Sequence, residues 1–192
     1  MEARERLLGA EHPDTLNSVN NMGVLHRRLG NYEESEKYTR RALEGNEKVL
    51  GAEDLGTILS VYNMGEILNS MGNYEEAEKY SRRALEVREK VLGAGHPKTL
   101  DSLESRGSIL QSMENYEEAE KLYKRVLEGR EKVFGPEHLD TLESLNNMGS
   151  ILQNMENYEE AEKYYRKALE GREKLLGSEH PSTIWSLNCT GS

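Results

Sequence analysis

The sequence repeats itself with a constant period of 42 residues over its whole length. A glycine opens each period, and the block Asn-Tyr-Glu-Glu returns at residues 31, 73, 115 and 157 without any insertion or deletion. A period of this size is typical of arrays in which each unit is one small supersecondary structure. We therefore divide the chain into four full repeats (9–50, 51–92, 93–134 and 135–176) and two partial repeats (1–8 and 177–192).

Each repeat carries two helical patterns that are separated by a turn. In the first repeat an apolar stripe begins at Leu16 and steps by three and four residues, which is the period of a helix. Gly30-Asn31 interrupts this stripe, as turn residues do. A second stripe then runs to Gly51, a residue typical of a helix C-terminus. We expect helix A over 13–29 and helix B over 32–50, and the same pair in every later repeat.

A glycine in the middle of each A helix predicts a close helix crossing. Glycine inside a helix costs about 1 kcal/mol relative to alanine, so four such glycines in register indicate a compensating gain in packing. We expect helix B to cross at this point with a small residue facing the glycine. The expected pairs are Gly23 with Ala42, Gly65 with Ala84, Gly107 with Val126 and Gly149 with Ala168.

A single helix pair buries only one of its faces, and the next pair in the chain covers the other. Repeats of this kind stack in one dimension, and each contacts only its neighbours. Such an array has no thick central core. This explains how a chain in which only 35% of the residues are hydrophobic can fold.

Several blocks of the sequence resemble the tetratricopeptide repeat. Asn21-Met22-Gly23, Gly30-Asn31-Tyr32 and Ala42-Leu43 match positions of that motif. The usual unit has about 34 residues, whereas the longer unit here and the segment His96-Pro97-Lys98-Thr99 are similar to the kinesin-light-chain type. The resemblance implies one all-α domain over 1–192, a right-handed superhelical α-solenoid of antiparallel helix pairs.

The resemblance also implies a function. In proteins of this family the A helices line a concave groove that holds an extended peptide of a partner, so we expect a non-catalytic interaction scaffold. Side-chain amides suit a peptide main chain because they both donate and accept hydrogen bonds, although any one of these asparagines could instead bond within the fold. The predicted peptide-binding residues are Asn17, Asn20, Asn21, Arg27, Arg28, Tyr62, Asn63, Glu66, Asn69, Glu104, Gln111, Asn146, Asn147 and Gln153.

Charge is unevenly distributed along this predicted groove. Arg27 and Arg28 lie in the first repeat, whereas Asp101, Glu104 and Glu143 follow in the third and fourth. We therefore expect a ligand to place its acidic part near the two arginines. Its basic or polar parts would then lie toward the later repeats.

Composition and charge argue against several other functions. The net charge of −10 disfavours a nucleic-acid-binding surface, which is generally basic. No apolar run reaches the roughly 20 residues of a membrane span, and one cysteine rules out an internal disulfide framework. We therefore expect a cytoplasmic protein that does not bind membranes.

The sequence contains no convergent set of catalytic groups, so we expect neither an enzyme nor a cofactor. The inter-repeat histidines fall one to a repeat. Stacked helices lie about 8–10 Å apart, whereas metal ligands lie about 2 Å from the ion, so we expect helix starts there and no metal site. These histidines are His12, His96, His138 and His180.

Several residues depart from the repeat pattern. Glu114 and Glu156 stand where the first two repeats have the turn glycines Gly30 and Gly72. Arg106 stands where the other full repeats have methionine. We expect Arg106 either to pair with an acid on a neighbouring helix or to weaken the third repeat.

A second function stays open. The two partial repeats lack their partner helices, so apolar side chains such as Leu7, Ile184, Trp185 and Leu187 are expected to be partly exposed. They could join copies of the chain head to tail. The alternative is therefore a structural or self-assembling spacer without a peptide ligand.

Overall fold

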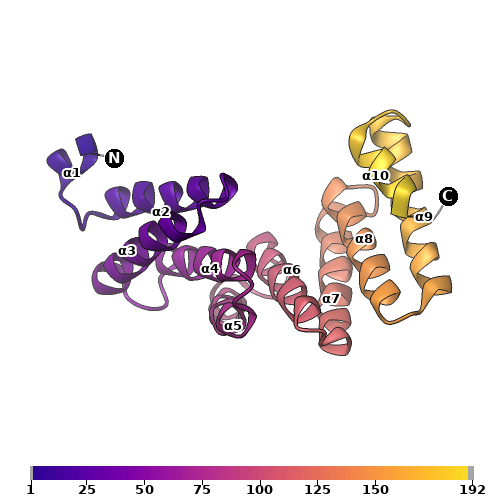
Figure 1. Ribbon diagram of the computed structural model, residues 1–192, viewed down its shortest axis with the longest axis horizontal. Helices are drawn as coiled ribbons and strands as arrows, with labels where there is room; N and C mark the ends of the chain where they lie inside the picture. Colours follow the sequence, from indigo (N-terminus) through magenta and orange to yellow (C-terminus); the bar gives the residue numbers. More distant parts are fainter. Residues whose placement is uncertain (1, 190–192) are drawn as a thin grey trace. The chain divides into compact units, whose positions relative to one another are not determined.

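The computed structural model describes residues 2–189 (Figure 1), with the backbone alone at 2, 3, 185, 188 and 189. Every regular element among these residues is an α-helix, as the sequence predicts. The helices are α1 (Glu2–Leu8), α2 (Pro13–Arg28), α3 (Tyr32–Leu50), α4 (Leu55–Ser70), α5 (Tyr74–Leu92), α6 (Pro97–Ser112), α7 (Tyr116–Phe134), α8 (Leu139–Asn154), α9 (Tyr158–Leu176) and α10 (Pro181–Cys189).

The chain forms two compact units, residues 1–93 and 94–192. In the first unit α2 packs on α3, α3 on α4 and α4 on α5. In the second unit α6 packs on α7, α7 on α8, α8 on α9 and α9 on α10. Each A helix and the B helix that follows it form a hairpin (Figure 1). The even-numbered helices are the predicted A helices, and the odd-numbered helices are the predicted B helices.

The helix starts confirm the role predicted for the histidines. The Nδ1 atom of His96 accepts a hydrogen bond from the backbone N–H of Lys98 (3.1 Å), which is otherwise an unsatisfied donor at the helix N-terminus. Asp54 serves the same purpose at α4, where its carboxylate accepts from the N–H of Gly56 (2.7 Å). His12, His138 and His180 cap α2, α8 and α10 in the same way.

The helices cross closely at the mid-helix glycines, but the residues that face them differ from the prediction. A Cβ atom at Gly107 would lie 2.9 Å from the ring of Tyr123, and one at Gly23 would meet the Thr39 hydroxyl. The prediction of Ala42 opposite Gly23 is therefore wrong. The facing residue is one turn earlier on helix B, because the two helices come closest there.

The turn between the helices of a hairpin keeps one backbone conformation whatever its sequence. Gly30 and Gly72 have φ of 76° and 78°, and Glu114 and Glu156 have φ of 60° and 61°. This left-handed region is costly for a residue with a Cβ atom. The two glutamates therefore carry backbone strain that the glycines avoid.

Arg106 occupies a core position of the repeat. Met64 and Met148, its counterparts, are buried, whereas Arg106 is half-buried. Lys121 and, more weakly, Arg106 lower the pKa of Glu118 on α7. The charge of Arg106 thus acts on an acid of the next helix, and the two sequence predictions for this residue stay predictions.

Candidate functional site

Within each unit, one side chain of a B helix contacts the A helix that follows it. In the second unit Arg130 of α7 donates from Nη1 to the Ser144 hydroxyl (2.9 Å) and to the Asp140 carbonyl oxygen (3.1 Å) of α8. We call this pair of bonds the inter-repeat clamp. Equivalent pairs of bonds occur at three other places. They join Arg4 to Ser18 and Asp14, Asn46 to Ser60 and Gly56, and Arg172 to Ser186 and Ser182.

The clamp arginines also contact the A helix of their own repeat. Arg130 forms a bidentate ion pair with Glu104, with both N–O distances at 2.8 Å. With the Asn146 amide oriented so that its oxygen faces the guanidinium, that oxygen accepts from Arg172 Nη2 (2.8 Å). Arg88 lies over the ring of Tyr62, 4.5 Å from its centroid. Arg130 and Arg172 therefore each contact the A helices on both sides of their own B helix.

The ion pair of Glu104 and Arg130 is largely removed from water. Burial raises the pKa of the Glu104 carboxyl, and the Arg130 guanidinium opposes this shift. The negative charges of Glu143 and Asp101 raise it further. The second unit therefore has a region of its A-helix face where carboxylates crowd over a buried guanidinium.

The first unit places its predicted binding residues in two different environments. On α2, Asn17, Asn21 and Arg28 are exposed. Asn20 of α2 and Asn63 of α4 are buried, and Tyr62 and Asn69 of α4 are half-buried. The exposed residues can contact a ligand directly, whereas Asn20 and Asn63 are buried within the fold.

Arg27, one of the two predicted acid-binding residues, has an internal partner. Its guanidinium lies 3.6 Å from the carboxylate of Glu66, another residue of the predicted set. The pair joins α2 to α4. An acidic ligand group would therefore compete with Glu66 for Arg27.

In the second unit the predicted residues are brought together by hydrogen bonds between α6 and α8. The Asn147 amide donates to Glu104 (2.8 Å), and the Gln111 amide donates to the Ser150 hydroxyl (3.1 Å). Asn147 thus bonds within the fold, which was one of the two alternatives left open by the sequence. Its carbonyl oxygen has no hydrogen-bond partner among the described residues and can still accept from a ligand.

Two tyrosines hold the glutamines of this surface. The Tyr123 hydroxyl donates to Gln111 Oε1 (3.0 Å), and the Tyr165 hydroxyl donates to Gln153 Oε1 (3.0 Å). Both rings lie against the mid-helix glycines Gly107 and Gly149. The close helix crossing therefore orients side chains of the A helices as well as packing the hairpin.

A cavity of about 380 Å³ opens between α8 and the start of α10. It is lined by Glu143, Asn146, Asn147, Arg172 and Pro181-Ser182. Within the described part of the chain, no group of three or more histidine, cysteine or acidic side chains could hold a metal ion. The cavity therefore offers hydrogen-bonding groups rather than a metal site.

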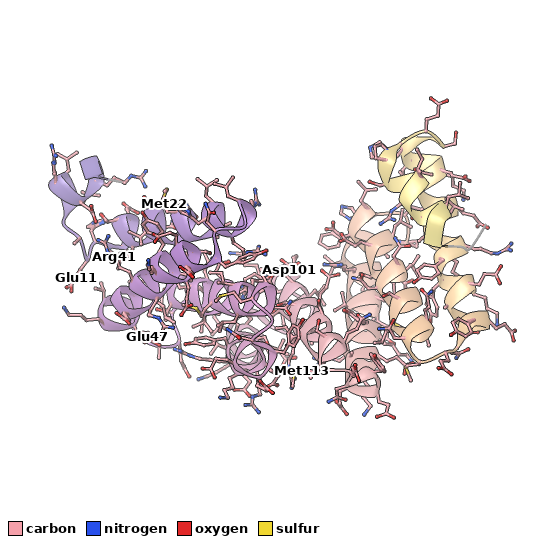
Figure 2. The ribbon with its side chains drawn as sticks, viewed as in Figure 1. Glu11, Met22, Arg41, Glu47, Asp101 and Met113 are labelled. Carbon is pink, nitrogen blue, oxygen red and sulfur yellow. The ribbon has the colours of Figure 1, made fainter. Side chains whose placement is uncertain are left out.

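The outer face of the B helices differs, because its charges pair with one another. Arg83 of α5 lies 2.7 Å from Glu47 of α3 (labelled in Figure 2). Lys48 pairs with Glu11 (2.5 Å), and Lys90 pairs with Glu53 (2.7 Å). Such exposed pairs are worth about 0–1 kcal/mol each. Many charges of this face are therefore held in ion pairs.

Sequence reasoning missed the clamp residues, although a signal for them exists. A serine recurs 14 residues after each clamp position, at Ser18, Ser60, Ser102, Ser144 and Ser186. This spacing joins helix B of one repeat to helix A of the next. The recurrence of arginine with serine at that distance could have predicted the contact.

Comparison with known proteins agrees with this architecture. A tetratricopeptide repeat family model matches residues 1–48, 54–132 and 103–151, and a second model of that description matches residues 141–182. No curated protein sequence matches the chain significantly. No helix of the described residues is long and apolar enough to cross a membrane.

Solved structures share the fold. The nearly identical TPR-like repeats of a kinesin-light-chain-related protein from Podosopora anserina have a TM-score of 0.82 and 22% identity, with 93% of this chain and 85% of that chain covered. BtubC (BKLC) from P. vanneervenii has a TM-score of 0.79 and 20% identity, with 88% of this chain and 68% of that chain covered. These likenesses show a helical-repeat solenoid fold. With the family models matching most of its length, the chain belongs to the tetratricopeptide repeat family.

Proposed function

We propose that this protein is a non-catalytic, cytoplasmic scaffold that binds an extended peptide segment of a partner along its A helices. Tetratricopeptide repeats generally serve protein–protein interaction. The observation that carries the proposal is the contrast between the two faces. Exposed polar groups such as Asn17, Asn21 and Glu143 line the A helices, whereas many charges of the B helices are held in ion pairs within the chain.

The side chains of the A helices suit an extended main chain. The carbonyl oxygen of Asn147 is available to a peptide N–H, while its N–H group is held by Glu104. Gln111 and Gln153 are held by tyrosine hydroxyls. Because these groups are already ordered, a ligand would bind with little loss of side-chain entropy from the protein.

Charge suggests the orientation of such a ligand. Asp101 and Glu143 are exposed on α6 and α8, and the described residues of α8 include no lysine or arginine. Basic side chains of the ligand would lie there. Arg28 is exposed on α2 and would receive an acidic group, in preference to Arg27, which pairs with Glu66.

A peptide-display selection against the whole chain tests the proposal. Affinity of a selected peptide is then measured by fluorescence anisotropy on an A-face variant (Asn17→Ala, Asn21→Ala, Glu143→Ala) and on a matched B-face variant (Glu44→Ala, Glu86→Ala, Glu170→Ala). All six positions are exposed. We expect the A-face variant to bind about tenfold or more weakly and the B-face variant to bind as the parent does. The reverse pattern would overturn the proposal.

Exposed apolar side chains favour self-association as a second candidate. Leu7 of α1 is 83% exposed, and Ile184 and Leu187 of α10 are 46% and 45% exposed. The side chain of Trp185, which the sequence analysis placed in this contact, lies outside the described side chains. Sedimentation velocity over a range of concentrations tests this candidate, and a monomer at every concentration would exclude it.

A further inference from the structure

The first full repeat keeps the acceptors of the inter-repeat clamp but lacks its arginine. The clamp position holds arginine at residues 4, 88, 130 and 172, and holds asparagine at Asn46. Asparagine has a shorter side chain with a single pair of N–H donors, whereas arginine presents five donors in a planar fork. The acceptors around Asn46 therefore face fewer donors than their counterparts do.

The bonds made by Asn46 are long. Its amide donates to the Gly56 carbonyl oxygen at 3.4 Å and to the Ser60 hydroxyl at 3.2 Å. The bond to the serine is shorter for Arg4 (2.6 Å) and Arg130 (2.9 Å), whereas the bond to the carbonyl oxygen measures 3.1 Å for Arg130 and 3.5 Å for Arg4 and Arg172. Typical N–H···O distances are about 2.9–3.0 Å, so Asn46 binds Ser60 less closely than the clamp arginines bind Ser18 and Ser144.

A third acceptor in this place has no donor at all. Asn20 is only 2% exposed, and its side-chain oxygen has no hydrogen-bond partner among the described residues. Its counterparts Glu104 and Asn146 each accept from the clamp arginine of their own repeat. A buried acceptor without a donor is unfavourable, and this oxygen holds the repeat position that accepts from a guanidinium in the third and fourth repeats.

We propose that Asn20, Gly56 and Ser60 form a binding site for the guanidinium of an arginine side chain from a partner protein. The ligand supplies the group that helix B supplies in the other repeats. Arginine is favoured over lysine because its guanidinium presents five donors to these three acceptors, whereas an ammonium has three donors. Asn17 is exposed one turn before Asn20 on α2, so the buried acceptor lies close to the exposed A-helix face. The site does not depend on peptide binding elsewhere on that face.

Ethylguanidinium, the terminal part of an arginine side chain, is the probe for this site. The ¹⁵N-labelled full chain is titrated with ethylguanidinium chloride at constant ionic strength, and sodium chloride serves as the salt control. We expect saturable shifts of the Asn20 and Asn46 side-chain amide signals and of neighbouring α2 and α4 amides. Shifts that grow linearly without saturation, or that sodium chloride reproduces, would overturn the proposal.

Two variants make the test specific. Asn46→Arg places the repeat's own guanidinium in the site, so it should weaken ethylguanidinium binding about tenfold or more and should raise the melting temperature. Arg172→Asn copies the arrangement of the first repeat into α9, next to Asn146 and Ser186, and should create a second saturable site. A lower melting temperature for Asn46→Arg, or unchanged binding by it, would contradict the proposal. The absence of a new site in folded Arg172→Asn would also contradict it.

Discussion

Arg130 of α7 and Glu104 of α6 form a bidentate ion pair, with both N–O distances at 2.8 Å, beneath the A-helix face of the second unit. The same guanidinium reaches Ser144 of the next A helix. One buried side chain therefore fixes the spacing of α6 and α8 and orients Glu104 toward Asn147. The surface proposed to bind a partner rests on this contact.

Removal of Arg130 alone should be costly. Arg130→Met leaves the Glu104 carboxylate partly buried without its partner, and such losses cost about 3–5 kcal/mol. Replacing both partners (Arg130→Met with Glu104→Met) removes the uncompensated charge and should recover much of the loss. Urea denaturation followed by circular dichroism measures both free energies of unfolding. A double variant less stable than the single variant would contradict this account.

The stability contributed by Glu104 should depend on pH in a defined direction. Burial raises the pKa of its carboxyl in the folded state above the ordinary value of 4.5. The contribution of Glu104 to the free energy of unfolding is then fully present below pH 4.5. It is lost as the pH rises from there through the raised pKa of the folded state. Glu104→Gln cannot titrate, so the wild-type free energy of unfolding minus that of the variant should fall over this range. A difference that rises with pH would show that the ion pair outweighs the burial.

Replacing either turn glutamate by glycine should stabilise the protein. Glu114→Gly and Glu156→Gly relieve the left-handed backbone at φ of 60° and 61° and should each stabilise the chain by about 1 kcal/mol. The matched control is Gly30→Glu, which introduces the same strain at φ of 76° and should destabilise by a similar amount. Thermal unfolding of the three variants and of the parent chain measures these changes in stability. Equal melting temperatures for all of them would reject the strain.

The histidine caps predict a simple substitution series. His96→Ala removes the acceptor for the Lys98 N–H and should cost about 1 kcal/mol. His96→Asp should retain or improve the cap, because Asp54 makes the corresponding bond at 2.7 Å. Urea midpoints at neutral pH compare the two. Equal losses for both variants would mean that the imidazole contributes by packing rather than by capping.

The fold could be read from the sequence because it depends on a repeated pattern. A fixed period, helical apolar spacing and turn glycines place the first helix pair to within one residue, with α2 ending at Arg28 rather than the predicted Leu29. Each repeat supplies an independent copy of the same signal. Errors in one copy are therefore corrected by the others.

The details of the candidate site could not be read in the same way. The exposure of Asn17 and the burial of Asn20 follow from a fraction of a helical turn on one helix. The pairing of Arg27 with Glu66 depends on how two A helices lie side by side. Such side-chain partnerships differ between repeats, so no periodic signal predicts them.

The most direct test of the proposed function is photo-crosslinking with a selected peptide. A photoreactive amino acid is placed at Asn21 or Glu143 on the A helices, and at Glu44 or Glu170 on the B helices, all of which are exposed. The account predicts that the peptide crosslinks to the A-helix positions and that an excess of unlabelled peptide abolishes the crosslink. Crosslinking confined to the B-helix positions would contradict it.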